Sequence, residues 1–437
     1  MYFHRISYQI MNRFFCCLTF SIMMTIGVFA QNGTNSPYSQ YGIGDLSDQG
    51  VGFNKAMSGT GLAFRKGNEI NPLNPASYSS VDSLSMIFDA GLSGQITNYN
   101  ENGTTMSAKG GGFDYVTGLF RVFKNVGVNV GIMPFSNIGY SYSSTTRLPD
   151  MNTTVPVKYE GNGGLHQLFI GAGWTIFKPL SVGFNFAYLW GEYDRSVTST
   201  NTSINVLSRQ YTASVNSWKL DLGLQYDQPI GKSDYITLGA TFTPGHNLKA
   251  DPECKVISRN TSIGKSDTTS YVVSDALDIP TAWGVGLAYR HGTILRIGAD
   301  FQMQKWGSLS FPIVDGDNKY VMKSGLLKDS YKLNAGAEWM PNPMSRKFIN
   351  HVRYRIGAGF STPYYYINGQ EGPKDFHLSF GFGIPIMNAY NNRSILNISA
   401  QWQRRSADNL ITENTFRINI GLTFNERWFA KWKIEYE

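Results

Sequence analysis

The sequence contains few cysteines and few charged residues. Three cysteines occur in 437 residues, and two of them, Cys16 and Cys17, lie in an apolar stretch near the start of the chain. Without that stretch Cys254 stands alone, so no intrachain disulfide can form. Charged residues make up 16% of the chain, whereas soluble proteins contain about 25%. The low charge argues against an ordinary soluble enzyme.

Motifs for catalysis, metal binding and nucleic-acid binding are also missing. The histidines are scattered without metal-ligand spacing, and no Gly-x-Ser-x-Gly elbow or phosphate-binding loop occurs. His377 and Ser379 are the nearest candidates for a catalytic pair, but both are expected to face inward with the neighbouring glycines. The net charge of +7 includes no basic run. We therefore expect no enzymatic activity, no metal site, no cofactor and no nucleic-acid partner.

The only long apolar run lies at the start of the chain. Arg5 and Arg13 precede a run from Phe14 to Ala30 that ends in a small residue. This order predicts a cleaved signal peptide over residues 1–30. The alternative is a membrane anchor, for which a run of about 17 residues is barely long enough. After Ala30 no apolar run reaches the length of about 18 residues that a membrane-spanning helix needs.

Alternation of apolar and polar residues is the strongest pattern in the mature chain. Apolar Trp218, Leu220, Leu222, Leu224 and Tyr226 alternate with Lys219, Asp221, Gly223 and Gln225. Residues 181–190, 295–303 and 376–384 repeat the pattern. A period of two indicates β-strands, and segments of about ten such residues are typical of membrane barrels, whose side chains face lipid and lumen in turn. We expect Leu222 to face lipid and Gly223 to face the lumen, where Gly223→Ser should be mild.

The alternating segments predict fourteen strands. They lie at about residues 84–96, 111–121, 126–142, 165–177, 180–193, 213–226, 235–243, 282–290, 293–306, 331–339, 352–360, 376–384, 394–403 and 416–424. Short links, such as Lys178-Pro179, alternate with longer ones, of which residues 244–281 are the longest. Bacterial barrels have short turns at one end and long loops at the other. The sequence therefore predicts an all-β fold, a 14-stranded antiparallel transmembrane β-barrel over residues 83–437.

Residues 31–82 precede the first predicted strand and have no long periodic pattern. They carry too many apolar anchors for a disordered tail, namely Tyr38, Tyr41, Ile43, Leu46, Phe53, Met57, Leu62 and Phe64. A fourteen-stranded barrel has a lumen wider than its own side chains fill, since about eight strands already suffice for that. We therefore expect an N-terminal plug, or hatch, inside the lumen. Inward charges such as Glu338, Arg296 and Arg355 should form ion pairs there.

A plug followed by fourteen strands resembles the FadL family, the long-chain fatty-acid transporters of the outer membrane. Asn74, Pro75 and Ala76 match the family's Asn-Pro-Ala plug motif, and Ile279-Pro280 before Trp283–Tyr289 resembles a strand entry of the family. The opening Ser36–Leu46 resembles the Bacteroidetes branch of these barrels.

The resemblance implies a location in the cell outer membrane and two kinds of function. In the first, hydrophobic small molecules such as long-chain fatty acids pass through a plugged barrel with a lateral opening, in contact with outer-membrane lipids. The wider group also includes barrels that serve assembly or secretion machines. The alternative is therefore a structural subunit whose partners are other members of an outer-membrane complex.

Pro134 is the residue that fits its predicted strand least well. Proline donates no hydrogen bond and is confined to edges and bulges of a sheet. In the resembled family a kink in the third strand makes the lateral exit. The resemblance thus implies a lateral gate at Pro134, Phe135, Asn137 and Gly139. A simple bulge that side chains seal is the alternative.

Overall fold

The computed structural model describes residues 33–83, 85–147, 154–200, 205–260, 263–315, 319–386 and 394–427. The predicted signal peptide lies outside the described residues. Helices in the described part are short: η2 (Pro37–Gln40), α2 (Gly52–Lys55), η3 (Pro75–Ser80) and η4 (Phe348–His351). None of the helices found there is long and apolar enough to cross a membrane. The remaining ordered structure is almost entirely strand.

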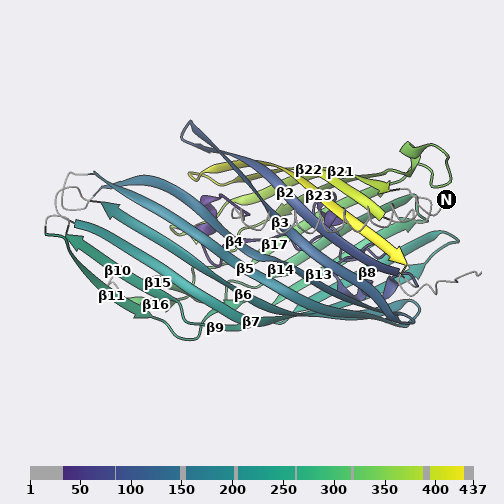
Figure 1. Cartoon of the computed structure of the whole chain (residues 1–437), viewed down its shortest axis with the longest axis horizontal. Coiled ribbons are helices and arrows are strands. Elements are labelled where there is room, and N and C mark those ends of the chain that lie inside the picture. The colour runs from purple at the N-terminus through teal and green to yellow at the C-terminus, as the bar shows by residue number, and fades with distance from the viewer. Residues whose placement is uncertain are drawn as a thin grey trace, which may run out of the picture.

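Fourteen antiparallel strands close into a barrel, which confirms the predicted fold class (Figure 1). The strands are β2 (Ser85–Glu101), β3 (Thr104–Phe123), β4 (Val126–Arg147), β5 (Thr154–Phe177), β6 (Leu180–Thr200), β7 (Asn205–Pro229), β8 (Asp234–Thr243), β13 (Ala282–His291), β14 (Leu295–Gln304), β17 (Ser330–Trp339), β18 (Arg353–Ser361), β21 (Lys374–Ile386), β22 (Ser394–Ser406) and β23 (Thr412–Arg427). Pairing between β2 and β23, from Ser85↔Arg427 to Asn100↔Thr412, closes the ring. All fourteen predicted segments fall on these strands.

The outer surface of the barrel is an apolar belt. Leu222 is 41% exposed on β7, while Gln225, three positions later and on the other face of the strand, is buried, as expected for lipid-facing and lumen-facing positions. Exposed aromatic side chains rim the belt, with Tyr188, Trp218, Trp283, Tyr331 and Trp402 toward the long-loop end and Trp174, Tyr226, Tyr289 and Trp339 toward the short-turn end. Two such aromatic girdles are typical of membrane barrels.

A charge on this belt should be costly. We expect Leu222→Arg to destabilise the folded barrel in a bilayer by about 2–4 kcal/mol if the residue lies near the midplane, because the guanidinium loses water. Refolding into liposomes from urea measures the change. The matched substitution Gln225→Arg, on the opposite face of β7, tests the face assignment. If the loss of stability in Gln225→Arg depended on bilayer thickness in the same way as the loss in Leu222→Arg, the assignment of the two faces would be contradicted.

The wall continues beyond the belt at the long-loop end. The hairpin of β10 (Glu253–Asn260) and β11 (Lys265–Val272) extends the sheet, because β10 pairs with the outer half of β7. Two further small sheets lie at this end, β9 (His246–Ala250) with β12 (Ala276–Ile279) and β15 (Phe311–Val314) with β16 (Tyr320–Lys323). The strand pair β19 (Tyr366–Ile367) and β20 (Gln370–Glu371) belongs to the connection between β18 and β21. A buried cluster that includes Leu189, Val215, Leu248 and Leu277 gives this region its own core.

The N-terminal segment, residues 33–82, lies inside the barrel (Figure 1). It contains η2, α2, η3 and the two-residue strand β1 (Asp45–Leu46). Its side chains and backbone contact inward-facing residues around the ring: Tyr115 on β3, Asn185 on β6, Gln225 on β7, Asp300 on β14 and Ser379 on β21. Phe53, Met57, Leu62 and Phe64 are almost fully buried.

Candidate functional site: an opening between strands β3 and β4

Strands β3 and β4 pair only near the short-turn end. Their ladder runs from Phe123↔Val126 to Val116↔Ile132. Beyond that rung β3 continues to Thr104 against β2, and β4 continues to Arg147 against β5. The two strands therefore diverge in the part of the wall that runs toward the long loops, and the described residues leave a gap there (Figure 1).

Irregularities in both strands explain the divergence. The register of β4 against β5 shifts between Pro134 and Ser136, and the register of β2 against β3 shifts between Gly91 and Leu92. Next to the first shift, Gly164 of β5 and Gly191 of β6 have positive φ values of 140° and 148°. A side chain at either glycine would collide with a neighbouring backbone carbonyl. The crease across β4, β5 and β6 thus depends on proline and glycine.

The N-terminal segment occupies part of the gap on the β4 side. Strand β1 pairs antiparallel with β4, in the register Asp45↔Asn137 and Leu46↔Ser136. The pairing continues where the Ser47 amide donates to the Phe135 carbonyl at 3.0 Å.

Further hydrogen bonds join the N-terminal segment to the strands on both sides of the gap. The amide of Gly139 donates to Ser39 Oγ at 3.2 Å, and Gln49 Nε2 donates to the Pro134 carbonyl at 3.1 Å. On the opposite strand, Asn35 Nδ2 donates to the Lys109 carbonyl at 2.8 Å. The four residues proposed for the gate thus lie together on β4, where each lies against the N-terminal segment.

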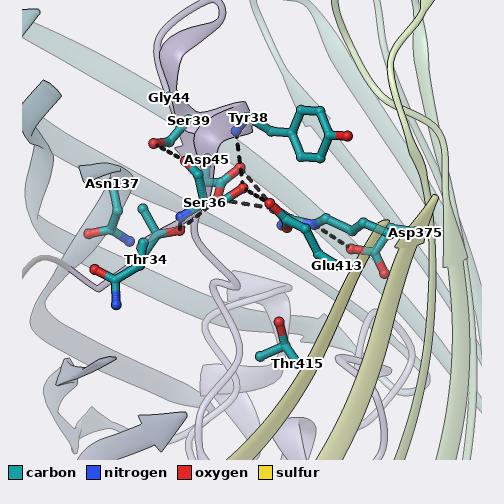
Figure 2. A network of polar contacts seen from close by, with 12 residues as sticks. Thr34, Ser36, Tyr38, Ser39, Gly44, Asp45, Asn137, Asp375, Glu413 and Thr415 are labelled. Carbon is teal, nitrogen blue, oxygen red and sulfur yellow. Dashed lines mark hydrogen bonds and ion pairs between the residues drawn. The ribbon is translucent and has the colours of Figure 1, made fainter. Parts of the chain in front are cut away.

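A polar network connects the same segment to strands β21–β23, on another side of the barrel wall. Figure 2 shows Thr34, Ser36 and Asp45 close to Asp375 and Glu413. Ser36 Oγ donates to Glu413 Oε1 at 2.6 Å, and Thr34 Oγ1 donates to Asp45 Oδ2 at 2.9 Å. Arg405 on β22 donates to Asp45 at 3.1 Å and to Asp375 at 3.2 Å. Residues 34–47 thus span the lumen from β4 to β21–β23.

A cavity of about 1460 Å³ lies beside this span. Its inner lining includes the polar and charged residues Asp48, Lys55, Lys332, Gln403 and Arg405, together with apolar and aromatic residues such as Leu73 and Tyr365. Its lining also includes residues of the lipid-facing belt, namely Leu92, Phe113, Val116, Ile420 and Leu422. The lining thus combines inward-facing residues with belt residues of β2, β3 and β23, next to the place where β3 and β4 diverge.

A second cavity, of about 160 Å³, lies deeper against the wall. Met133, Phe135 and Phe169 give it a mainly apolar lining. Leu46, Ser47 and Gln49 line both cavities. Strand β1 and the residues after it therefore form the partition between the two spaces.

The Asn74-Pro75-Ala76 motif lies elsewhere. Asn74 caps η3 by accepting a hydrogen bond from the Ala76 amide, and Pro75 is the first helical residue, an arrangement that favours helix initiation. Asn74 Nδ2 also donates to the Leu62 carbonyl at 2.8 Å and the Leu224 carbonyl at 3.1 Å. The motif fastens the N-terminal segment to the wall and takes no part in the lining of the large cavity.

Glycines of the wall make room for this motif. A Cβ atom added to Gly223 would collide with Asn74 Oδ1 and the Pro75 ring. The expectation that Gly223→Ser is mild is therefore wrong, because the sequence pattern does not show what packs against a lumen-facing glycine. We now expect Gly223→Ala to destabilise the protein by about 1–3 kcal/mol, as overpacking does. Gly94→Ala is the control, since nothing lies near its added Cβ. Urea midpoints that are equal for the two variants would contradict the contact.

Buried ion pairs hold the part of the N-terminal segment nearest the short-turn end. Glu69 pairs with Arg296 at 2.9 Å and also with Arg353. Glu338 pairs with Arg355 at 2.7 Å and with Arg296 at 3.1 Å. The wall residues of this cluster were expected to form lumenal ion pairs. Glu69 and Lys66, contributed by the N-terminal segment, were not anticipated.

The charge cluster is shielded from water. Lys66 lies 3.5 Å from Glu338 Oε1 and 3.6 Å from Glu69 Oε1. Burial lowers the pKa of Lys66 to about 8, although the two carboxylates act in the opposite direction.

Among the described residues, no group of three or more His, Cys, Asp or Glu residues could hold a metal ion. His377 and Ser379 are both buried on the inner face, where Ser379 Oγ lies 2.9 Å from Ser58 Oγ.

The fold is similar to that of solved toluene transporters and of a FadL homologue. The Pseudomonas putida toluene transporter TodX has 14% identity and a TM-score of 0.60, covering 88% of this chain and 100% of that one. A Pseudomonas aeruginosa FadL homologue has 12% identity and a TM-score of 0.59, covering 88% and 99%. The Ralstonia pickettii toluene transporter TbuX has 15% identity and a TM-score of 0.57, covering 87% and 99%. At these identities the likeness shows the shared fold.

Sequence comparison identifies the family. A search of curated proteins finds no match. A family model described as BamG matches residues 11–435. Because this match covers nearly the whole chain, the protein belongs to the BamG family.

Proposed function

We propose that the protein resides in the outer membrane and passes hydrophobic compounds, such as long-chain fatty acids, between the membrane and its lumen. The observation that carries the proposal is the single cavity lined both by lumenal residues and by Leu92, Phe113 and Ile420 of the lipid-facing belt. A molecule can enter this space sideways without crossing the polar headgroup layer. Structural neighbours described as toluene transporters share the fold.

In this proposal residues 31–82 act as the plug. The opening at Pro134, Phe135, Asn137 and Gly139 is the lateral gate, and β1 is its movable part. The ion pairs of Glu69 keep the rest of the plug fixed. Passage from the large cavity to the deeper apolar pocket then requires residues 45–49 to move.

Ligand binding tests the proposal. Purified mature protein in mild detergent should bind a fluorescent long-chain fatty acid saturably. Leu73 lines both cavities, so Leu73→Trp should reduce binding at least tenfold. Leu238→Trp, on the lipid-facing surface where Leu238 is 52% exposed, is the matched control. Equal binding by both variants, or no saturable binding by the wild type, would reject the transport proposal.

A specific observation favours a second candidate, a structural subunit of an outer-membrane assembly or secretion complex. Charged residues such as Lys55, Lys332 and Arg405 line the large cavity, and a hydrophobic molecule would have to pass them. At the long-loop end, β11 adds an exposed strand whose outer edge pairs with no described strand. Both features suit a barrel that holds partners.

Purification in mild detergent distinguishes the two candidates. A subunit should elute with stoichiometric partner proteins that mass spectrometry identifies and that salt does not remove. A transporter should elute alone with bound lipid or fatty acid. Elution as a single chain without partners, from membranes in which it is natively expressed, would reject the subunit proposal.

A further inference from the structure

The short-turn end of the barrel has one long described connection. Strands β3 and β4 are joined by Lys124-Asn125, and β5 and β6 by Lys178-Pro179. Between β17 and β18, residues 340–352 instead form a loop that contains η4. Turns at one end of bacterial barrels are normally short. The length of the loop 340–352 is therefore unusual.

The loop exposes three large apolar side chains. Met344, Phe348 and Ile349 are 93%, 50% and 59% exposed. Hydrogen bonds within the loop hold its shape: the Met344 amide donates to Asn342 Oδ1 at 2.9 Å, and Asn350 Nδ2 donates to Ser345 Oγ at 2.7 Å. Large apolar side chains held outward by an ordered loop usually mark a surface that meets another apolar phase.

The exposed side chains continue the lipid-facing belt. Tyr354 OH donates to the Ile349 carbonyl at 3.3 Å, which ties the loop to the first residues of β18. The Tyr354 ring lies 5.8 Å from that of Trp339, which is 51% exposed on the belt. The loop therefore begins and ends at the aromatic girdle, where the barrel meets the interface of the bilayer.

Positive charge surrounds the same girdle. Residues 340–352 include the exposed cations Arg346 and Lys347 and no acidic residue. Exposed Lys124, Lys178 and Lys232 occupy three other turns at this end. Lys124 and Lys178 directly follow the exposed strand-end residues Phe123 and Phe177, and Lys232 lies two positions after exposed Ile230 in its turn. An apolar belt bordered by cations is complementary to the acyl chains and headgroups of anionic lipids.

We propose that the loop 340–352 is a membrane anchor that binds anionic phospholipids in the leaflet at the short-turn end. Met344, Phe348 and Ile349 insert among the acyl chains, while Arg346 and Lys347 pair with the lipid phosphates. The loop lies at the opposite end of the wall from the β3–β4 opening. The anchor is therefore independent of whether the barrel transports small molecules or serves a complex.

Fluorescence in proteoliposomes tests the anchor. A Phe348→Cys variant of the mature chain, in a Cys254→Ser background, carries an environment-sensitive fluorophore. In phosphatidylcholine vesicles that contain phosphatidylglycerol, we expect quenching by brominated lipid and protection from aqueous iodide. The same label on Thr104→Cys, at the tip of the β2–β3 hairpin, should show the reverse.

The charge requirement is tested separately. Burial of the label at position 348 should decrease when phosphatidylglycerol is omitted or the salt concentration is raised, because headgroup attraction is screened. R346Q/K347Q should remove that lipid dependence while the barrel stays folded. Iodide quenching at position 348 equal to that at position 104 would overturn the proposal and leave the patch free for a protein partner. Lipid burial that is identical with and without phosphatidylglycerol would overturn the anionic-lipid assignment.

Discussion

Glu69→Ala should destabilise the folded barrel by about 3–5 kcal/mol, because it removes one of the two carboxylates that neutralise a buried cluster of arginines. Glu69 is the carboxylate that the N-terminal segment gives to the cluster, and it contacts Arg296, Arg353 and, at 3.7 Å, Arg355. Urea unfolding of the purified protein, followed by the mobility shift of the folded barrel on gels, measures the loss. Limited proteolysis should show faster cleavage within residues 33–82.

Glu160→Ala is the matched control for this prediction. Glu160 pairs with Lys158 at 2.7 Å, but both side chains are about half exposed on β5. Exposed ion pairs contribute about 0–1 kcal/mol, so this variant should unfold nearly as the wild type does. If Glu69→Ala unfolds at the same urea concentration as Glu160→Ala, the buried cluster does not hold the N-terminal segment in place.

A disulfide between β1 and β4 should abolish most transport, under the proposal that residues 45–49 must move. Leu46 and Ser136 face each other in register. Opposite residues of antiparallel strands have Cβ atoms about 4.5–5.5 Å apart, close to the separation that a disulfide needs. In a Cys254→Ser background, oxidised L46C/S136C should take up a labelled fatty acid at least tenfold more slowly than the reduced protein, and reduction should restore uptake.

The control pair is Lys158→Cys with Thr198→Cys, which are register partners on β5 and β6 away from the opening. Its oxidation should leave uptake unchanged, since those strands are already fully paired. Rapid uptake by oxidised L46C/S136C, with the disulfide verified by mass spectrometry, would show that β1 is a fixed part of the wall. The partition between the two cavities would then have no role in passage.

Alternation in the sequence predicted the strands where the wall crosses the lipid-facing belt. It failed for the parts of the wall beyond the belt. Side chains such as Leu222 and Phe376 must face lipid, so the pattern is strong wherever the wall crosses the apolar belt. Beyond the belt both faces of a strand meet water, and the pattern stops. Strand β7 therefore begins at Asn205, eight positions before its predicted start at 213, and β11 was missed altogether.

The site was predictable only in part. Pro134 indicated the right strand because proline cannot donate a hydrogen bond to the ladder, and the register shift lies beside it. The sequence gives no sign that Asp45 and Leu46 pair with that strand, because a two-residue strand has no periodicity. Adjacent glycines at 163 and 164 were a readable signal of a crease. The Arg405 network brings together residues hundreds of positions apart, such as Asp45 and Arg405. A single sequence contains no signal for such a contact.

Carbene labelling from within the bilayer tests the central claim, that the large cavity is continuous with the membrane between β3 and β4. A small apolar diazirine is dissolved in proteoliposomes and activated by light, and labelled residues are located by mass spectrometry. We expect label on lipid-facing Leu92 and Phe113 and also on cavity residues such as Lys332 and Gln403. Label confined to the lipid-facing belt, with Lys332 and Gln403 unmodified, would contradict the account.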